Sequence, residues 1–303
     1  MDKRTRNIDD RFAGIDRLYG FGSAARLARA HVCVVGIGGV GSWVAEALAR
    51  SGFGRITLID ADDVCVSNTN RQSHALIGLF GRAKVDVVGE RLRAINPELE
   101  VDTIAQFLTP ENIPVLLDRG YDGVIDACDA LKVKVQMIAF CRRRKVPIVV
   151  SGSAGGRRDP TLITARDLSR TEHDVMLGMI RKKLRDDYGW TRNPKRYFGV
   201  QAVFSRENVN YPQPDGSVCK TRDADAEGTM KLDCAGGLGA VMHVTAAFGM
   251  VAVARLIERL LEWKHGAKHS QSDTARRGHA AGTEDIATDC GLSNGSSRDR
   301  QPT

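Results

Sequence analysis

Short apolar runs alternate with helical segments between residues 31 and 152, and this alternation constrains the fold more than any other feature. The β-branched runs that we predict to be strands are 31–36, 55–60, 99–106, 121–129 and 146–152. The segments between them that we predict to be helices are 40–52, 81–97, 109–120 and 130–145. Strands separated by helices form right-handed crossovers and a mostly parallel sheet covered by helices. We therefore predict an α/β fold with a Rossmann-like sheet.

The pattern loosens after Gly156. The elements predicted there are strands at 162–168 and 199–205, a helix at 171–187 and a long apolar helix at 237–262. We expect this half to extend the same sheet. From residue 264 to 303 the only large aliphatic residues are Ile286 and Leu292, so we predict a disordered tail that cannot bury enough surface to fold.

The apolar segment 236–261 is long enough to suggest a membrane span. It contains His243, Thr245 and Arg255, so we predict a buried helix at a core or subunit interface, without membrane insertion. The seven cysteines are scattered and form no CxxC pair, which disfavours a zinc site or a disulfide framework. The N-terminus is polar and has no signal-peptide core. A reducing, cytoplasmic location fits these features best.

A glycine loop, GIGGVG at 36–41, follows the first predicted strand and precedes a helix. Gly36, Gly38 and Gly41 match the pattern G-x-G-x-x-G, in which the backbone turns tightly and approaches a phosphate at a helix N-terminus. Asp60 lies 19 residues after Gly41, at the end of the next predicted strand. Such an acid can hold the ribose of NAD or of ATP, so the loop predicts a nucleotide site without choosing between them.

The segment LIDADDVCVSNTNRQ (58–72) favours ATP. Hydride transfer has no need for the Asp62, Asn68, Arg71 and Gln72 side chains beside a nucleotide, whereas attack on the α-phosphate needs cations for the phosphates and acids for Mg²⁺. Lys84 adds a second cation. Asp129 ends the strand predicted at 121–129, and the carboxyl ends of parallel strands meet at one crevice.

These motifs resemble a known family. GIGGVGS, LIDADDVCVSNTNRQ, GRAKV and IDACD are similar to sequences of the ubiquitin-activating-enzyme-like family that includes ThiF and MoeB. RFAGIDRLYG, FCRRRK, VSGSAGGRRDPT, VFSRENVNYPQPDGSVC and KLDCAGGLGAVMHVTAAFGMVA resemble the branch of that family that dehydrates threonylcarbamoyl-adenosine in tRNA. The resemblance covers about residues 11–262 and excludes the tail.

The resemblance implies an adenylating domain at 1–263, with a nucleotide-binding half at about 10–156 and a substrate, tRNA and dimer half at about 157–263. It also implies a homodimer that uses ATP and Mg²⁺. The implied nucleotide-binding residues are Gly36, Gly38, Gly39, Gly41, Asp60, Asp62 and Gln72. The implied catalytic residues are Asn68, Arg71 and Lys84 on the phosphates, Asp129 on Mg²⁺, and Arg17 (with Arg11 as second choice) on the phosphates of the neighbouring subunit.

The implied reaction is ATP-dependent dehydration of threonylcarbamoyl-adenosine in the anticodon loop of tRNA, through adenylation of the threonine carboxylate. An alternative is adenylation of the C-terminus of a ubiquitin-like sulfur-carrier protein. NAD-dependent oxidation and a non-catalytic RNA-binding role are further alternatives. Family members are linked to a cysteine desulfurase and its sulfur acceptor, so such a pair is a candidate partner and Cys234 a candidate thiol.

The segment RKKLRDDYGWTRNPKRYFG (181–199) interleaves seven basic residues with aromatic ones. Cations and aromatic rings together suit the phosphates and unstacked bases of an RNA loop. The candidate tRNA-binding residues are Lys182, Lys183, Arg192, Lys195 and Arg196. Further basic clusters occur at 142–145 and 157–158.

Overall fold

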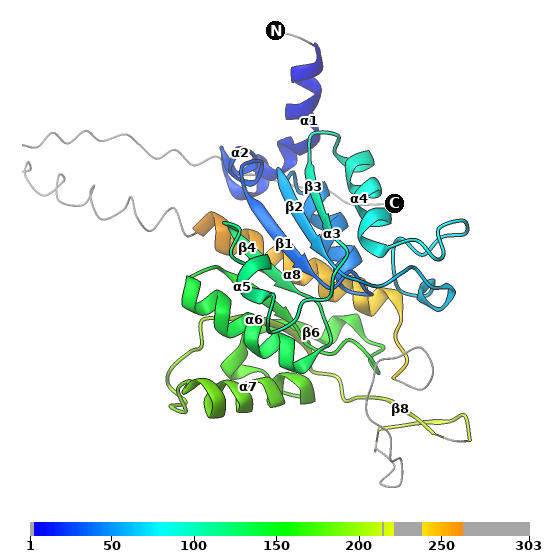
Figure 1. Cartoon of the computed structure of the whole chain (residues 1–303), viewed down its shortest axis with the longest axis vertical. Coiled ribbons are helices and arrows are strands. Elements are labelled where there is room, and N and C mark those ends of the chain that lie inside the picture. Colours follow the sequence, from blue (N-terminus) through cyan, green and yellow to red (C-terminus); the bar gives the residue numbers. More distant parts are fainter. Residues whose placement is uncertain (1–2, 214, 221–237, 263–303) are drawn as a thin grey trace, which may run out of the picture. The chain divides into compact units, whose positions relative to one another are not determined.

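The computed structural model describes residues 3–213, 215–220 and 238–262, all within one compact unit (Figure 1). Its main sheet has seven strands in the order β3 (Glu100–Ile104), β2 (Arg55–Ile59), β1 (His31–Val35), β4 (Gly123–Asp126), β5 (Ile148–Ser151), β7 (Gln201–Ser205) and β6 (Ile163–Asp167). All neighbours pair in parallel except β6, which is antiparallel to β7. The predicted Rossmann-like fold is confirmed, and the second half of the chain extends the same sheet. The predicted domain boundaries stay predictions.

The helices follow the predicted alternation. The described α-helices are α1 (Lys3–Tyr19), α2 (Ser23–Leu27), α3 (Gly41–Arg50), α4 (Lys84–Ile95), α5 (Ile113–Leu116), α6 (Leu131–Arg144), α7 (Val175–Tyr188) and α8 (Met242–Glu262). Short 3₁₀ turns occur at η1 (Val66–Asn68), η2 (Pro160–Leu162) and η3 (Leu168–Arg170), and β8 (Tyr211–Pro212) pairs with β9 (Val218–Cys219). The helix predicted at 109–120 is reduced to α5, because Thr109 and Asn112 bond each other in a turn that delays its start.

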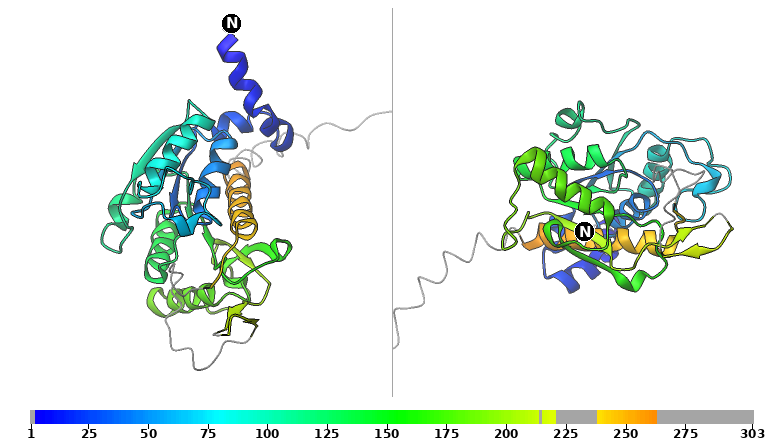
Figure 2. Two further views of the ribbon diagram at one scale, coloured as in Figure 1. Left: turned by 90° about the vertical axis from the view of Figure 1, so that its right-hand side faces the viewer. Right: turned by 90° about the horizontal axis from the view of Figure 1, so that it is seen from below.

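Two hydrophobic layers enclose the sheet. Val32 and Val34 of β1 pack with α3, α4 and α8, whereas Cys33 and Val35 pack with α5, α6 and α7 on the opposite face. A strand buried on both faces must be apolar at every position, which explains the continuous β-branched run of β1. Figure 2 (left) shows α8, in orange, along one side of the sheet. No described helix is long and apolar enough to cross a membrane.

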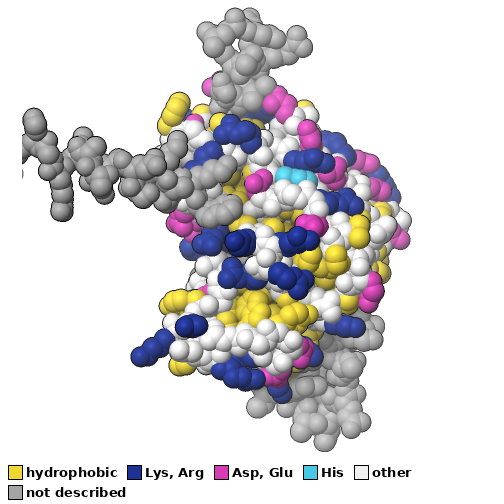
Figure 3. Space-filling model, turned by 60° about the vertical axis from the view of Figure 1, so that its left-hand side comes forward, with side chains coloured by type: hydrophobic (Ala, Val, Ile, Leu, Met, Phe, Trp, Pro, Cys, Tyr) yellow, Lys and Arg dark blue, Asp and Glu magenta, His cyan; other side chains and the backbone are white. Residues whose placement is uncertain are grey.

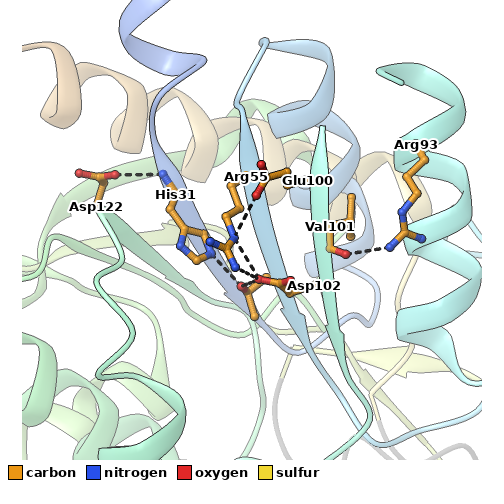
Figure 4. A network of polar contacts seen from close by, with 8 residues as sticks. His31, Arg55, Arg93, Glu100, Val101, Asp102 and Asp122 are labelled. Carbon is orange, nitrogen blue, oxygen red and sulfur yellow. Dashed lines mark hydrogen bonds and ion pairs between the residues drawn. The ribbon is translucent and has the colours of Figure 1, made fainter. Parts of the chain in front are cut away.

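A polar network ties the amino ends of β1, β2 and β3 together (Figure 4). The backbone N–H of His31 donates to the Asp122 carboxylate at 2.9 Å, and the Arg55 guanidinium lies 2.8 Å from the Asp102 carboxylate. Arg93 of α4 donates to a β3 carbonyl at 2.7 Å. Exposed ion pairs add little stability, so we infer that the network mainly fixes the strand register. That register sets where the carboxyl ends of the strands fall.

Candidate active site

A crevice of about 300 Å³ opens at the carboxyl ends of β1, β2, β4 and β5. The residues predicted from sequence that line it are Gly36, Gly38, Gly39, Asp60, Asp62, Asn68, Arg71, Gln72, Lys84 and Asp129. Segments that lie far apart in the chain therefore converge where the strand-end argument expects a ligand. Gly41 and Arg17, which the sequence also suggested, do not line this crevice.

The glycine loop combines two structural tasks. Gly36 has a positive φ of 86°, and a Cβ on it would lie 2.8 Å from the backbone of Ala127. A Cβ on Gly41 would lie 1.7 Å from the carbonyl oxygen of Gly36, so Gly41 is needed for the helix to start against the strand. Gly38 and Gly39 face the crevice, where small residues leave the backbone open to a ligand.

Asp60 connects the glycine loop to the loop that follows β2. Its Oδ2 accepts a hydrogen bond from the N–H of Ile37 at 2.6 Å, and its Oδ1 accepts one from the N–H of Asp62 at 2.8 Å. A carboxylate offers about four acceptor sites, so these two bonds leave capacity for further donors such as ribose hydroxyls. The same side chain can therefore shape the site and bind a ligand in it.

Two cations lie beside the glycine loop. Lys84 is the first residue of α4 and only 5% exposed, and its Nζ lies 2.7 Å from Oδ2 of Asp62. The Arg71 guanidinium donates to the Ser67 carbonyl and to the side chain of Asn70, at 2.9 Å each. The carbonyl of Arg71 accepts a hydrogen bond from the indole of Trp43 at 3.0 Å. These contacts hold positive charge at the crevice before any ligand binds.

Asn68 and Gln72 are buried and belong to the same loop as Arg71. The Asn68 side-chain oxygen accepts the N–H of Cys65 at 3.0 Å and so closes the 3₁₀ turn η1. The Gln72 amide lies behind Gly38, and among the described residues its Oε1 has no hydrogen-bond partner. An unsatisfied buried amide oxygen lining a crevice is available to a donor on a ligand or a water molecule.

Asp129 is exposed and lies three residues after the end of β4, close in sequence to a buried ion pair. The Nζ of Lys134 lies 2.8 Å from Oδ1 of Asp126, and both side chains are fully buried. Lys134 also donates to the carbonyl of Cys128 at 2.8 Å, which fixes the residue next to Asp129. Burial alone would lower the pKa of Lys134, but the Asp126 carboxylate outweighs it and raises that pKa. The pair is not apparent from the sequence, because a lysine on a helix usually faces solvent.

The described residues include no cluster of three or more His, Cys, Asp or Glu side chains that could hold a metal ion. Mg²⁺ in phosphate-transfer sites commonly uses only one or two carboxylates and completes its coordination with water and phosphate oxygens. Asp129, as an exposed carboxylate in a crevice with cations for phosphates, fits that arrangement.

Some crevice residues were missed from the sequence. Phe107, which directly follows the strand predicted at 99–106 and is 64% exposed, lines the crevice, and the strand-end argument could have identified it. Thr245 of α8 and Ser153 after β5 also line the crevice. His74, which does not line the crevice, is 1% exposed, and neither of its ring nitrogens has a hydrogen-bond partner in the described part of the chain. Burial, and secondarily the charge of Lys84, lower the pKa of His74 to about 4.

Helix α1 lies near the amino ends of the strands (Figure 1), whereas the crevice lies at their carboxyl ends. Phe12 packs against Gly52, after α3, and Arg11 contacts Asn96 at 3.4 Å, between α4 and β3. Arg17 is exposed on this helix. Within one chain, neither arginine is placed to meet a phosphate bound in the crevice.

The predicted tRNA-binding residues lie outside the crevice and are all exposed. Lys182 and Lys183 belong to α7, and Arg192, Lys195 and Arg196 belong to the loop before β7. Figure 3 shows a face on which Lys and Arg side chains border a hydrophobic patch. Among the predicted tRNA-binding residues, Arg192 is paired with an acid, since its guanidinium lies 2.6 Å from the Asp186 carboxylate. Cys234 and the tail at 264–303 lie outside the described residues.

Comparisons with known proteins identify the family of this chain. The model of the ThiF family matches residues 13–276. The chain is 51% identical to the tRNA threonylcarbamoyladenosine dehydratase of Escherichia coli K12, over 83% of this chain and 93% of that protein. It is 49% identical to the dehydratase of the same name from Haemophilus influenzae, over 86% of this chain and 97% of that protein.

A solved structure is similar as well. The E. coli tRNA N6-threonylcarbamoyladenosine dehydratase TcdA in complex with ATP superposes with a TM-score of 0.75 and 45% identity, covering 86% of this chain and 97% of that one. Sequence, fold and crevice residues thus lead to one assignment. The chain belongs to the ThiF family and, within it, to the tRNA threonylcarbamoyladenosine dehydratases.

Proposed function

We propose that this protein uses ATP to dehydrate threonylcarbamoyl-adenosine in tRNA to its cyclic form. The observation that carries the assignment is the composition of the crevice. It brings together the glycine loop, an acid placed to bind a ribose (Asp60), two cations (Arg71 and Lys84) and an exposed acid (Asp129). Relatives that match nearly their whole length bear the name of this dehydratase, and one of them has been solved with ATP. The nucleotide site and the family point to the same chemistry.

We assign the nucleotide to the glycine-loop side of the crevice. Asp60 binds the ribose hydroxyls, and the backbone of Gly38 and Gly39 lies along the phosphates at the start of α3. Arg71 and Lys84 supply positive charge to the phosphates. Without a ligand, Lys84 pairs with Asp62, and this pair holds the lysine in place. A bound phosphate would then be a second anion beside Lys84. Asp129 would hold Mg²⁺, and the bound ion would neutralise phosphate charge.

The chemistry follows from the poor reactivity of a carboxylate. An oxygen of the threonine carboxylate attacks the α-phosphorus of ATP, forms a P–O bond and displaces pyrophosphate. The resulting acyl-adenylate has AMP as a good leaving group. The neighbouring carbamoyl group attacks the acyl carbon, the bond to AMP breaks, and the ring closes with net loss of water. Ring closure is intramolecular and gains a high effective concentration, so the protein mainly positions groups and stabilises phosphoryl charge.

The assembly and setting are further parts of this proposal. Arg17 is exposed on α1, away from its own crevice, and we infer that it serves the crevice of a second subunit in a homodimer. The adenylating domain spans residues 1–263, and Lys182, Lys183, Arg192, Lys195 and Arg196 bind tRNA. A cytoplasmic location suits a tRNA substrate. A cysteine desulfurase and sulfur-acceptor pair stays a predicted partner.

The function is tested with tRNA that carries threonylcarbamoyl-adenosine. The tRNA is incubated with protein and Mg-ATP, and its nucleosides are analysed by mass spectrometry while AMP is quantified. Wild-type protein should remove one water from the modified nucleoside and release AMP. Asp129→Ala and Arg71→Ala should each lose about 100-fold or more in rate. Asp118→Ala serves as a control, because that exposed acid lies outside the crevice.

Either of two results would contradict the assignment. One is an unchanged nucleoside in a wild-type preparation that binds ATP, which would favour activation of a carrier protein. The other is full activity in both variants, which would show that the crevice is not the reaction site.

A further inference from the structure

A second cavity, of about 430 Å³, opens where α6 and α7 end. Its lining includes Arg142 and Arg143 from α6, Tyr188 from the end of α7, and Trp190, Tyr197 and Phe198 from the segment before β7. None of these residues lines the nucleotide crevice. We call this site the aromatic pocket. It joins two basic regions that are about 40 to 50 residues apart in the sequence, 142–145 and 181–199.

The inner wall of the aromatic pocket is rigidly built. Phe198 is only 4% exposed and meets Trp190 edge-on, with ring centroids 4.8 Å apart. The Arg185 guanidinium lies over the Phe198 ring at 5.5 Å. The backbone N–H groups of Phe198 and Gly199 donate to the Asp167 carboxylate at 2.9 and 2.6 Å. The rings are therefore held in place before a ligand arrives, which lowers the entropic cost of binding.

The outer wall offers an exposed ring and available positive charge. Tyr197 is 68% exposed, and the guanidinium of Arg170 stacks on it at 4.9 Å from the ring centroid. Within the described residues, Arg142 and Arg143 form no ion pair, whereas the neighbouring Arg144 pairs with an Asp118 carboxylate at 2.7 Å. The Arg143 guanidinium lies over the Phe140 ring at 5.9 Å, which leaves its charge available to an anion. Guanidinium groups without an acidic partner, beside an exposed aromatic ring, are suited to a phosphate attached to a stacked base.

Gly199 leaves room for the guanidinium of Arg142. A Cβ at Gly199 would lie only 3.1 Å from a guanidinium nitrogen of Arg142, and the residue has a positive φ of 71°. Any larger residue would therefore be strained and would crowd the guanidinium. The backbone therefore leaves room for Arg142 at the pocket.

The distance to the crevice indicates which part of a substrate the aromatic pocket meets. Val133 of α6 lines the nucleotide crevice, and Arg143 lines the aromatic pocket ten residues later on the same helix. At about 1.5 Å per residue, these positions are about 15 Å apart along the helix axis. Since the reacting nucleoside must occupy the crevice, a ligand in the aromatic pocket belongs to another nucleotide.

We propose, on the basis of the function proposed above, that the aromatic pocket binds an unpaired base of the substrate tRNA other than the modified nucleoside. The base stacks on Tyr197 against the wall formed by Trp190 and Phe198. Arg142 and Arg143 contact the adjoining phosphate. Binding at two sites whose lining residues are about 15 Å apart along α6 would let the enzyme accept a tRNA loop and reject a free nucleoside.

The test compares tRNA affinity and activity among matched variants. Tyr197→Ala removes the exposed ring, Tyr197→Phe keeps it, and Arg143→Gln removes a pocket charge. Arg144→Gln removes a charge from the same helix outside the pocket. We expect Tyr197→Ala to weaken tRNA binding about tenfold to hundredfold, and Tyr197→Phe to restore it. Arg143→Gln should weaken binding and reduce the slope of log affinity against log salt by about one. The KM for ATP should not change.

A second measurement locates the base. Substrate tRNAs with single 2-aminopurine substitutions outside the modified position are titrated with wild-type and Tyr197→Ala protein. One or two unpaired positions should change fluorescence with the wild type and fail to do so with the variant. Equal tRNA affinity in Tyr197→Ala, Arg144→Gln and wild type, or no position that responds, would overturn the proposal. The proposed function is judged separately, by whether the wild type dehydrates its substrate at all.

Discussion

Replacing Lys134 by methionine should damage both stability and catalysis, because it leaves the Asp126 carboxylate buried without its cation. Both side chains are fully buried, and Oδ2 of Asp126 already has no hydrogen-bond partner among the residues that the structure describes. Removing one partner of a buried ion pair costs about 3–5 kcal/mol. For a domain of this size, that loss corresponds to a fall in Tm of about 6–20 °C. The carbonyl of Cys128 also loses its donor, so the position of Asp129 should become less defined.

The assay is thermal and urea unfolding of Lys134→Met, Asp126→Asn and the double variant, together with the rate of AMP release. The double variant should be more stable than Lys134→Met, because no buried charge is left alone. Arg255→Met is the control, since its pair with Glu258 is exposed and should be worth less than about 1 kcal/mol. The reasoning is wrong if Lys134→Met unfolds within about 1 kcal/mol of wild type, or if the losses of the two single variants simply add.

Three further changes probe the glycine loop, the buried histidine and the N-terminal helix. Gly41→Ala should lower the free energy of unfolding by about 3 kcal/mol or more, because its methyl group would lie 1.7 Å from a backbone oxygen. Gly38→Ala should keep the wild-type Tm and raise the KM for ATP. Equal Tm values for the two variants would contradict this. In the folded protein the pKa of His74 is about 4, below its unfolded value of 6.5. The stability that depends on neutral His74 is therefore fully present above pH 6.5 and is lost as the pH falls towards 4. Between pH 7 and pH 4.5, the free energy of unfolding measured by denaturant titration should fall by roughly 2–3 kcal/mol less in His74→Leu than in wild type. The same pH dependence in both proteins would refute this. Mixing inactive Arg17→Ala and Asp129→Ala subunits should recover activity, and failure would place Arg17 outside the neighbouring crevice.

The sheet could be predicted from sequence because strands buried on both faces are apolar at every position. The run 31–35 of β1 and the glycine turn after it are unambiguous for that reason. The reversed direction of β6 could not be predicted. It follows an irregular connection from β5 through the turn η2, so no intervening helix signals a crossover.

The crevice was predictable to the extent that its residues follow strand ends. Asp60 and Asp129 both do so, and they meet because parallel strands end at one edge. Lys134 was missed because its burial depends on an acid eight residues earlier that becomes its partner only in the fold. The aromatic pocket was foreseen only as a basic, aromatic segment. Its second wall comes from the end of α6, whose approach to α7 is a matter of tertiary packing.

The most direct test of the acyl-adenylate mechanism follows the carboxylate oxygens. Threonylcarbamoyl-adenosine in tRNA is labelled with oxygen-18 in the threonine carboxylate and incubated with enzyme and Mg-ATP. If the carboxylate attacks the α-phosphorus, the AMP released must carry one labelled oxygen, and the cyclic product keeps the other. Unlabelled AMP, or ADP with labelled phosphate, would show that the carboxylate is activated by another route and would contradict the proposed mechanism.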